Sequence, residues 1–184
     1  PEAVTNTLLI AERCAQFDLT EDLGYEFPDF AGSERGGGME SLAAMCLGKI
    51  SQLYEPGSEE ERDAEERLHT ELCLVDLHGL AGFFLVYRDI MKLAGEVARE
   101  VRGEAPRGSS GLPAGRGRGS SVSSIICYLI GLSHIDPVKN NLFLGRFLNE
   151  ALHSVPDIDL DFPRDIREQL ILRVYNKYGH EHTG

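Results

Sequence analysis

Three aspartates alternate with apolar residues in the C-terminal part of this chain, over the run from Asp157 to Phe162. Alternate residues of a β-strand point to the same face, roughly 7 Å apart along it. The run therefore predicts a strand with Asp157, Asp159 and Asp161 on one face and the intervening apolar residues facing a core. This segment therefore constrains both structure and chemistry.

Three like charges on one strand repel one another unless a positive group lies among them. A divalent metal ion meets that need. Oxygen ligands suit Mg²⁺, which takes one or two protein carboxylates and completes its shell with water and phosphate oxygens. Two such ions, about 4 Å apart, activate an attacking hydroxyl and stabilise a leaving pyrophosphate. The strand thus predicts a metal site suited to phosphoryl transfer.

The acidic run is also compatible with two other interpretations. The aspartates could form a solvated strand face, although Asp is a poor strand former. The acids between Asp157 and Glu168 also have the spacing of a calcium-binding EF-hand loop. That loop requires a tight turn, usually made by glycine, where this chain has Phe162 and Pro163. The geometry of such a loop is therefore disfavoured.

A second motif runs from Gly115 to Ser121 and alternates glycine with arginine before two serines. Glycines let a backbone approach a ligand closely, and N–H groups at a helix start attract anions. Arg116 and Arg118 add charge and bidentate geometry for phosphate. The P-loop pattern is absent, and a Gly/Arg-rich loop can also be a simple linker. Paired with the downstream acidic strand, it predicts an anion site beside a metal site, as phosphoryl transfer requires.

Apolar periodicity and capping residues predict that the rest of the chain is mostly helical. The expected helices cover 5–17, 39–54, 58–77, 82–101, 121–130 and a last segment from Pro163 to Gly179. Its inner stripe is expected to hold Ile166, Leu170, Ile171 and Val174. Residues 18–38 and 102–120 are expected loops, the second mobile over 103–111.

Charge is unevenly distributed along the chain, whose net charge is −12. Residues 1–100 hold 8 basic and 21 acidic residues, while residues 101–184 hold 10 and 9. Because only the local field matters for binding phosphates, the acidic total does not exclude nucleic acid as a partner. No apolar run approaches the roughly 20 residues of a membrane span. Four scattered cysteines form no zinc motif, and with no signal peptide evident we expect a cytoplasmic protein.

Several segments together, in this order and spacing, resemble the palm of bacterial C-family DNA polymerases, the DNA polymerase III alpha subunits and their error-prone relatives. They are Gly79–Val86, Gly117–Ser121, Ile135–Pro137, Arg146–Asn149 and Pro156–Phe162. The resemblance implies an α+β fold, with the mixed β-sheet palm of the polymerase-beta-like nucleotidyltransferase type, packed helices and a helix-rich N-terminal part. Residues 1–38 would be the tail of a preceding PHP domain and its linker, and residues 39–184 the N-terminal, incomplete part of the palm.

The resemblance also implies roles for individual residues. Asp157 and Asp159 match the catalytic aspartates that bind two Mg²⁺ ions, for which Mn²⁺ can substitute, whereas Asp161 matches a position that is not a main ligand. The matches to nucleotide-binding positions are Arg118, Gly119, Ser120 and Arg146. A third catalytic aspartate of the family lies after the thumb, and nothing in this chain can supply it.

The function implied is that of a DNA-directed DNA polymerase, which transfers a nucleotide from a dNTP to a primer 3′-hydroxyl on a template. Primer–template DNA and dNTP would be its partners, with a sliding clamp and other replisome subunits bound through regions absent here, and no membrane. The 184-residue chain alone is expected to be inactive. The alternative is a non-catalytic nucleic-acid-binding module that uses the same basic loop.

Overall fold

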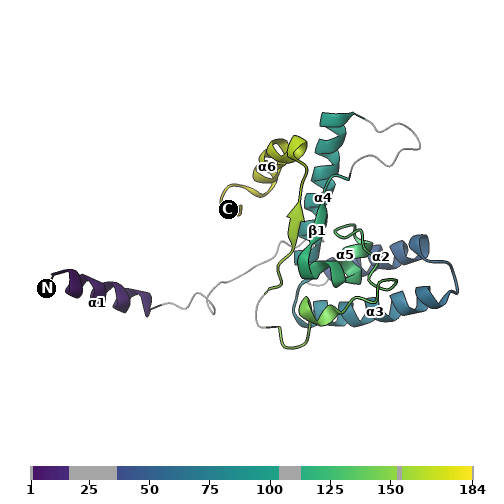
Figure 1. Cartoon of the computed structure of the whole chain (residues 1–184), viewed down its shortest axis with the longest axis horizontal. Helices are drawn as coiled ribbons and strands as arrows, with labels where there is room; N and C mark the ends of the chain where they lie inside the picture. The colour runs from purple at the N-terminus through teal and green to yellow at the C-terminus, as the bar shows by residue number, and fades with distance from the viewer. Residues whose placement is uncertain (1, 17–36, 104–112, 153–154, 184) are drawn as a thin grey trace.

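The computed structural model describes residues 2–16, 37–103, 113–152 and 155–183, and its elements are mostly helices (Figure 1). Strands β1 (Arg116–Arg118) and β2 (Asp159–Asp161) form a two-stranded antiparallel sheet. The fold is α+β as expected, although the sheet in these residues is antiparallel and not mixed. The helices are α1 (Glu2–Cys14), α2 (Gly37–Leu53), α3 (Glu59–Leu77), α4 (Ala81–Arg102), α5 (Ile125–Leu129) and α6 (Arg164–Tyr178), with 3₁₀ turns η1 (Gly119–Ser123) and η2 (Leu144–Arg146).

The helices predicted over 39–54, 58–77 and 82–101 are confirmed as α2, α3 and α4, with ends shifted by at most two residues. Local signals explain this agreement. Ser58 Oγ accepts a hydrogen bond from Glu61 N at 3.0 Å, so Ser58 caps α3 as such residues commonly do. Gly79, with φ of +64°, follows the end of α3 in a conformation that favours glycine.

Two predicted loops lie mainly outside the described residues, namely 18–38 and the segment 103–111 that was expected to be mobile. The first predicted helix begins at Glu2, three residues before the expected Thr5. None of the residues of α1 is buried, and Val4, Leu8 and Ile10 are each at least 60% exposed. Helix α1 therefore contributes nothing to the core described below.

The main core lies where α2, α3, α4 and α5 meet (Figure 1). The rings of Phe84 on α4 and Phe147 after η2 contact each other edge to face, with centroids 6.2 Å apart. This contact brings the segment after η2 onto the helical core. Large side chains with at most 1% exposure in this cluster are Leu42, Ile50, Leu68, Phe84, Ile125, Ile126, Leu132 and Leu148.

A second, smaller core joins α4 to α6. Ile166 and Leu170 are buried there as predicted, and Val174 is partly buried. The prediction for Ile171 is wrong, because its side chain is 44% exposed. Ile171 directly follows Leu170, and the next residue along a helix turns by about 100°, which takes it off the inner stripe.

Polar contacts add to this second interface. Arg173 pairs with Glu100, and Arg102 Nε lies 2.6 Å from Asp165 Oδ2. Nearer the other end of the interface, Asp89 Oδ2 accepts from Tyr178 Oη at 2.6 Å and lies 2.5 Å from Lys177 Nζ. These contacts and the apolar cluster together fix α6, the helix that directly follows β2.

The sheet pairs Arg116 with Asp161, Gly117 with Leu160, and Arg118 with Asp159. The central glycine is required by space, because its N–H donates to Leu132 O at 2.5 Å and an added Cβ would lie 2.8 Å from that oxygen. A residue with a side chain at this position would push β1 away from the backbone beside it.

All four cysteines, Cys14, Cys46, Cys73 and Cys127, are free thiols. Among the described residues, no single helix has the length and hydropathy to cross a membrane. In the same described residues, the pair α3 and α4, bent by 112° at their junction, meets such a test on length and composition.

The substitution Asp89→Asn tests the link between α4 and α6. Burial alone would raise the pKa of Asp89, but Lys177 and Tyr178 outweigh it and lower that pKa below its usual value. Its stabilising effect is then fully present above the unfolded carboxyl pKa of about 4, and is lost as the pH falls through the lower folded pKa. We expect Asp89→Asn to reduce the melting temperature near neutral pH but hardly at all in strong acid, as measured by circular dichroism.

Glu168→Gln is the matched control, since Glu168 is an exposed carboxylate on the same helix α6. It should leave the melting temperature nearly unchanged at every pH. A loss in Asp89→Asn that is equally large in strong acid would contradict the electrostatic explanation.

The substitution Gly117→Ala tests the close approach of β1 to Leu132. Overpacking of this kind should lower the free energy of unfolding by about 1–3 kcal/mol in a denaturant titration. Gly48→Ala is the control, because Gly48 lies within α2 with no atom within 4 Å of an added Cβ. That variant should gain about 0.5–1 kcal/mol. Equal effects of the two substitutions would show that space at Gly117 is not limiting.

Candidate functional site

Strands β1 and β2 bring the glycine–arginine motif and the acidic strand side by side, although they lie about forty residues apart in the chain. Arg118, the last residue of β1, is paired with Asp159, the first residue of β2. The 3₁₀ turn η1 begins at the next residue, Gly119. The juxtaposition that the sequence suggested is therefore present.

The alternation of exposure predicted for the acidic run is confirmed, although only Asp159–Asp161 of that run forms a strand. Asp157, Asp159 and Asp161 are exposed, whereas Ile158 between the first two is only 3% exposed. The EF-hand interpretation is excluded, because Asp159–Asp161 is a strand and α6 begins at Arg164, where that loop would still be continuing.

The positive group among the three carboxylates is Arg118. Its Nη1 lies 3.4 Å from Asp159 Oδ2, and its Nε donates to Asp161 Oδ1 at 3.1 Å. The three side chains are each 46–59% exposed. Exposed pairs of this kind contribute little to stability, about 0–1 kcal/mol each. Arg118 can therefore exchange a carboxylate for another anion at small cost.

At two further positions of this motif, the backbone conformation or the lack of space favours glycine. Gly119 has φ of +73°, a conformation that L-residues with side chains rarely adopt. An added Cβ at Gly119 would lie 3.9 Å from Asp159 Oδ2, so the backbone of the turn passes close to the acidic strand. At Gly115, an added Cβ would lie 2.6 Å from the ring of Phe162.

The helix predicted over 121–130 is wrong at its start. Residues 119–123 form η1, Ser124 is extended, and α5 covers only Ile125–Leu129. Serine hydroxyls compete with helical hydrogen bonding in this segment. Ser121 Oγ donates to Arg118 O at 2.9 Å, and Ser124 Oγ accepts from Cys127 N at 3.1 Å.

Because α5 starts later than predicted, the backbone N–H groups that could bind an anion also differ from those expected. The N–H groups of Ile125 and Ile126 at the start of α5 donate to the Glu71 carboxylate, so they already have a negative partner. The expectation that a helix start would attract phosphate is therefore wrong for α5. The remaining candidates are Gly119 and the exposed Ser120 in η1.

Arg146 is exposed at the end of η2, and η2 contacts η1. The neighbouring part of its motif is structural. His78 Nε2 lies 2.9 Å from Asn149 O, and Asn149 Nδ2 donates to Gly145 O at 3.1 Å. These contacts hold η2 against the end of α3, and they place Arg146 on the segment beside the candidate turn.

The negative charge of the acidic strand affects the pKa of Tyr87 on α4. Burial raises the pKa of Tyr87, and the charge of Asp157 and, less strongly, that of Asp159 raise it further, although a hydrogen bond to the backbone of Ile158 acts in the opposite direction. The phenol of Tyr87 therefore lies close enough to the first two aspartates for their charge to disfavour its ionisation.

Whether these residues suit a divalent metal depends on the donor set. Within the described parts of the chain, no group of three or more His, Cys, Asp or Glu side chains could hold a metal ion. Asp157 and Asp159 nevertheless offer exposed hard oxygen atoms, and Mg²⁺ needs only one or two protein carboxylates when water and phosphate complete its shell. The site thus fits Mg²⁺ as a partial site completed by substrate, not as a closed protein cage.

Sequence reasoning missed Glu71 and Arg67 on α3. Glu71 is fully buried, and Arg67 Nη2 donates to Ser123 O at the end of η1 at 2.6 Å. A signal was present, because Glu71 shares the helical spacing of the buried residues Ala64, Leu68 and Val75. A charged residue on such an inner stripe needs a partner inside the protein.

An apolar hollow of about 750 Å³ lies between α4, β2 and α6. Tyr87, Ile158, Leu160, Phe162 and Leu170 are among the residues that line it. Its lining includes Asp161 of the acidic strand but neither Asp157 nor the turn η1, so it adjoins the candidate site at β2 without containing it.

Comparison with known proteins identifies the family to which this chain is similar. Residues 40–184 match the family model described as the bacterial DNA polymerase III alpha NTPase domain. Among similar curated proteins, the DNA polymerase III subunit alpha of Aquifex aeolicus is 33% identical over 99% of this chain. Error-prone DNA polymerase 2 of Rhizobium meliloti is 32% identical over 98% of the chain, and the DNA polymerase III subunit alpha of Escherichia coli is 31% identical over 98%.

The chain spans about 15% of the length of each of these relatives. The match nevertheless covers well over half of the chain and includes both the glycine–arginine motif and the acidic strand. The chain therefore belongs to the bacterial DNA polymerase III alpha family.

Proposed function

We propose that the β1–β2 face is the part of a DNA-directed DNA polymerase that binds Mg²⁺ and the triphosphate of an incoming dNTP. The observation that carries the proposal is the pairing of Arg118 with Asp159, which puts the turn η1 directly beside the acidic strand. Phosphoryl transfer depends mostly on positioning and charge neutralisation, and this arrangement offers anion-binding and cation-binding groups next to each other.

We assign a separate role to each group of residues on the β1–β2 face. Asp157 and Asp159 hold two Mg²⁺ ions, and Gly119 and Ser120 contact the triphosphate. Bound Mg²⁺ supplies charge neutralisation and activation of the primer 3′-hydroxyl. Arg118 leaves its exposed carboxylate partners for phosphate, for which its planar fork is suited.

Arg146 on η2 binds the same nucleotide from the adjoining segment. Residues 39–184 then form the N-terminal part of a palm of the polymerase-beta-like type, and residues 1–38 the end of a PHP domain and a linker. In the whole protein, primer–template DNA is the further substrate, and a sliding clamp and other replisome subunits are partners through regions outside this chain. The proposed location is the bacterial cytoplasm.

The substitution Asp157→Asn tests the metal site. The probe is Mn²⁺ titrated with dATP, followed by water-proton relaxation. Loss of an outer partner of a ligand typically weakens metal binding about 10–100-fold, so loss of a ligand itself should weaken it at least about tenfold. Asp159→Asn should have a similar effect.

Asp161→Asn is the matched control, because it removes the same charge from the same strand face and also an Arg118 contact. It should leave Mn²⁺ affinity within about fivefold, as expected for an exposed pair worth about 0–1 kcal/mol. Equal losses for Asp157→Asn and Asp161→Asn would show a general charge effect and contradict the assignment. Metal-independent, salt-sensitive binding of DNA would favour a non-catalytic nucleic-acid-binding module.

The isolated chain is expected to be inactive in primer extension with Mg²⁺ or Mn²⁺, because it lacks a third catalytic carboxylate and the parts that hold DNA. The measurement is gel analysis of a labelled primer on a template. Extension by the 184-residue chain that disappears in Asp159→Asn would contradict this expectation.

A further inference from the structure

Glu71 is a carboxylate with no exposed surface on the inner side of α3, and the proposed chemistry does not use it directly. Such a group is costly to bury unless it is paired and hydrogen-bonded. Burial raises the pKa of Glu71, while donors from Ser124, Ile125 and Ile126, and more weakly the charge of Arg67, act in the opposite direction. These partners indicate what the residue does.

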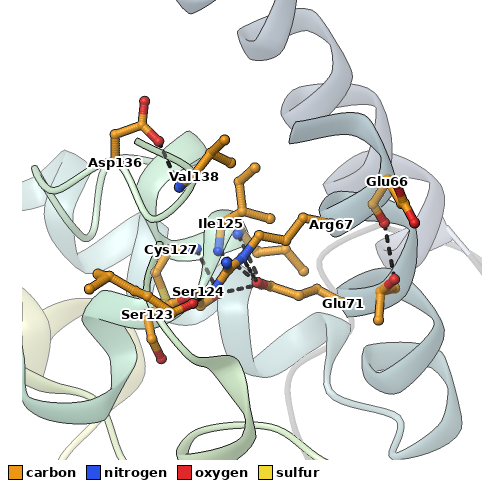
Figure 2. A network of polar contacts seen from close by, with 12 residues as sticks. Glu66, Arg67, Glu71, Ser123, Ser124, Ile125, Cys127, Asp136 and Val138 are labelled. Atoms are coloured by element: carbon orange, nitrogen blue, oxygen red, sulfur yellow. Dashed lines mark hydrogen bonds and ion pairs between the residues drawn. The ribbon is translucent and has the colours of Figure 1, made fainter. Parts of the chain in front are cut away.

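The Glu71 carboxylate caps the first turn of α5, which lies more than fifty residues away in the chain (Figure 2). Ser124 Oγ donates to Glu71 Oε2 at 2.6 Å. The backbone N–H of Ile125 donates to Oε1 at 2.8 Å, and that of Ile126 donates to Oε2 at 3.2 Å. An acid is favourable at a helix start, where N–H groups lack partners within the helix.

Arg67, one helical turn before Glu71, extends this network to Ser123 at the end of η1 (Figure 2). Its Nε lies 3.5 Å from Glu71 Oε1. Its Nη2 donates at 2.6 Å both to Ser123 O and to Leu142 O. Ser123 ends η1 and Leu142 precedes η2, so one guanidinium holds the two segments that carry the proposed nucleotide contacts.

Stability alone does not account for this network, because apolar residues of similar volume often stabilise a core as well as a buried ion pair does. A more specific consequence of the Arg67–Glu71 network is that it fixes the position of the turn η1. The pairing of β1 with β2 holds the start of η1, and Arg67 and Glu71 hold its end at Ser123 and Ser124. Gly119 and Ser120 lie between these two attachments.

We propose that Glu71 is a positioning residue which, together with Arg67, holds the Gly119–Ser123 turn beside the Asp159 strand for phosphate binding. This inference rests on the proposed function. Its own content is that a side chain on α3, which contacts the start of α5, sets the position of the turn without touching the nucleotide.

The test is Glu71→Gln in the 184-residue chain, which keeps the shape but places an amide donor among donors. Leaving a buried group unsatisfied costs about 1–3 kcal/mol, so amide hydrogen exchange over residues 119–126 should rise about tenfold. Exchange in α4 and α6 should stay the same. Affinity for inorganic tripolyphosphate with Mg²⁺, measured by calorimetry, should fall about tenfold for the same reason.

Glu66→Gln is the matched control, because Glu66 is an exposed acid on the same helix. It should change neither measurement. If Glu71→Gln does not fold, Ser124→Ala and Arg67→Lys serve instead. Ser124→Ala removes the hydroxyl link to Glu71 and also the hydrogen bond that Ser124 Oγ accepts from Cys127 N. Arg67→Lys keeps the charge but loses the fork that joins Ser123 to Leu142.

The outcomes separate the inference from the proposed function. A local rise in exchange together with weaker tripolyphosphate binding supports the inference. Unchanged exchange at 119–123, or an equal rise throughout the chain with unchanged affinity, overturns it and leaves Glu71 a merely structural residue. Absence of tripolyphosphate binding by the unaltered chain contradicts the proposed function and overturns the phosphate-binding part of the inference, while the exchange data still decide whether Glu71 holds the turn.

Discussion

The pairing of β1 with β2 is the contact on which the candidate site depends. It joins a glycine–arginine segment to an acidic strand through only three residue pairs. Two short strands are marginally stable on their own. The pairing therefore depends on packing at both of its sides, and Gly117 makes one side possible because it has no side chain to displace Leu132.

Two separate anchors support the sheet. On one side, α6 follows β2 directly and packs on α4 through a small apolar core and three sets of polar contacts. On the other side, Arg67 and Glu71 attach the turn after β1 to α3. The site thus lies between two parts of the helical framework, and a disturbance in either part would change the distance between turn and strand.

Sequence reasoning predicted the elements whose signals are local. Helical periodicity and the Ser58 cap located α2, α3 and α4, and the alternation around Asp159 located β2. It missed β1, because Arg and Gly have no strand preference and the pairing partner lies about forty residues away. It missed Glu71 for a related reason, since a charged side chain within a helix suggests solvent unless its inward position is considered together with its distant partners.

The charge of the site couples the binding of the two proposed ligands, Mg²⁺ and triphosphate. Asp157, Asp159 and Asp161 carry three negative charges, and two are offset by Arg118 and by Arg116, which lies opposite Asp161 in the sheet. A triphosphate that approaches η1 without a cation is repelled by the remaining charge, as like charges at short range must be. Metal and triphosphate should therefore bind with positive coupling, each raising the affinity for the other by the same factor. On this assignment, Arg118 pairs with Asp159 and Asp161 in the absence of ligand, and its planar fork would be available to phosphate if Asp157 and Asp159 held Mg²⁺.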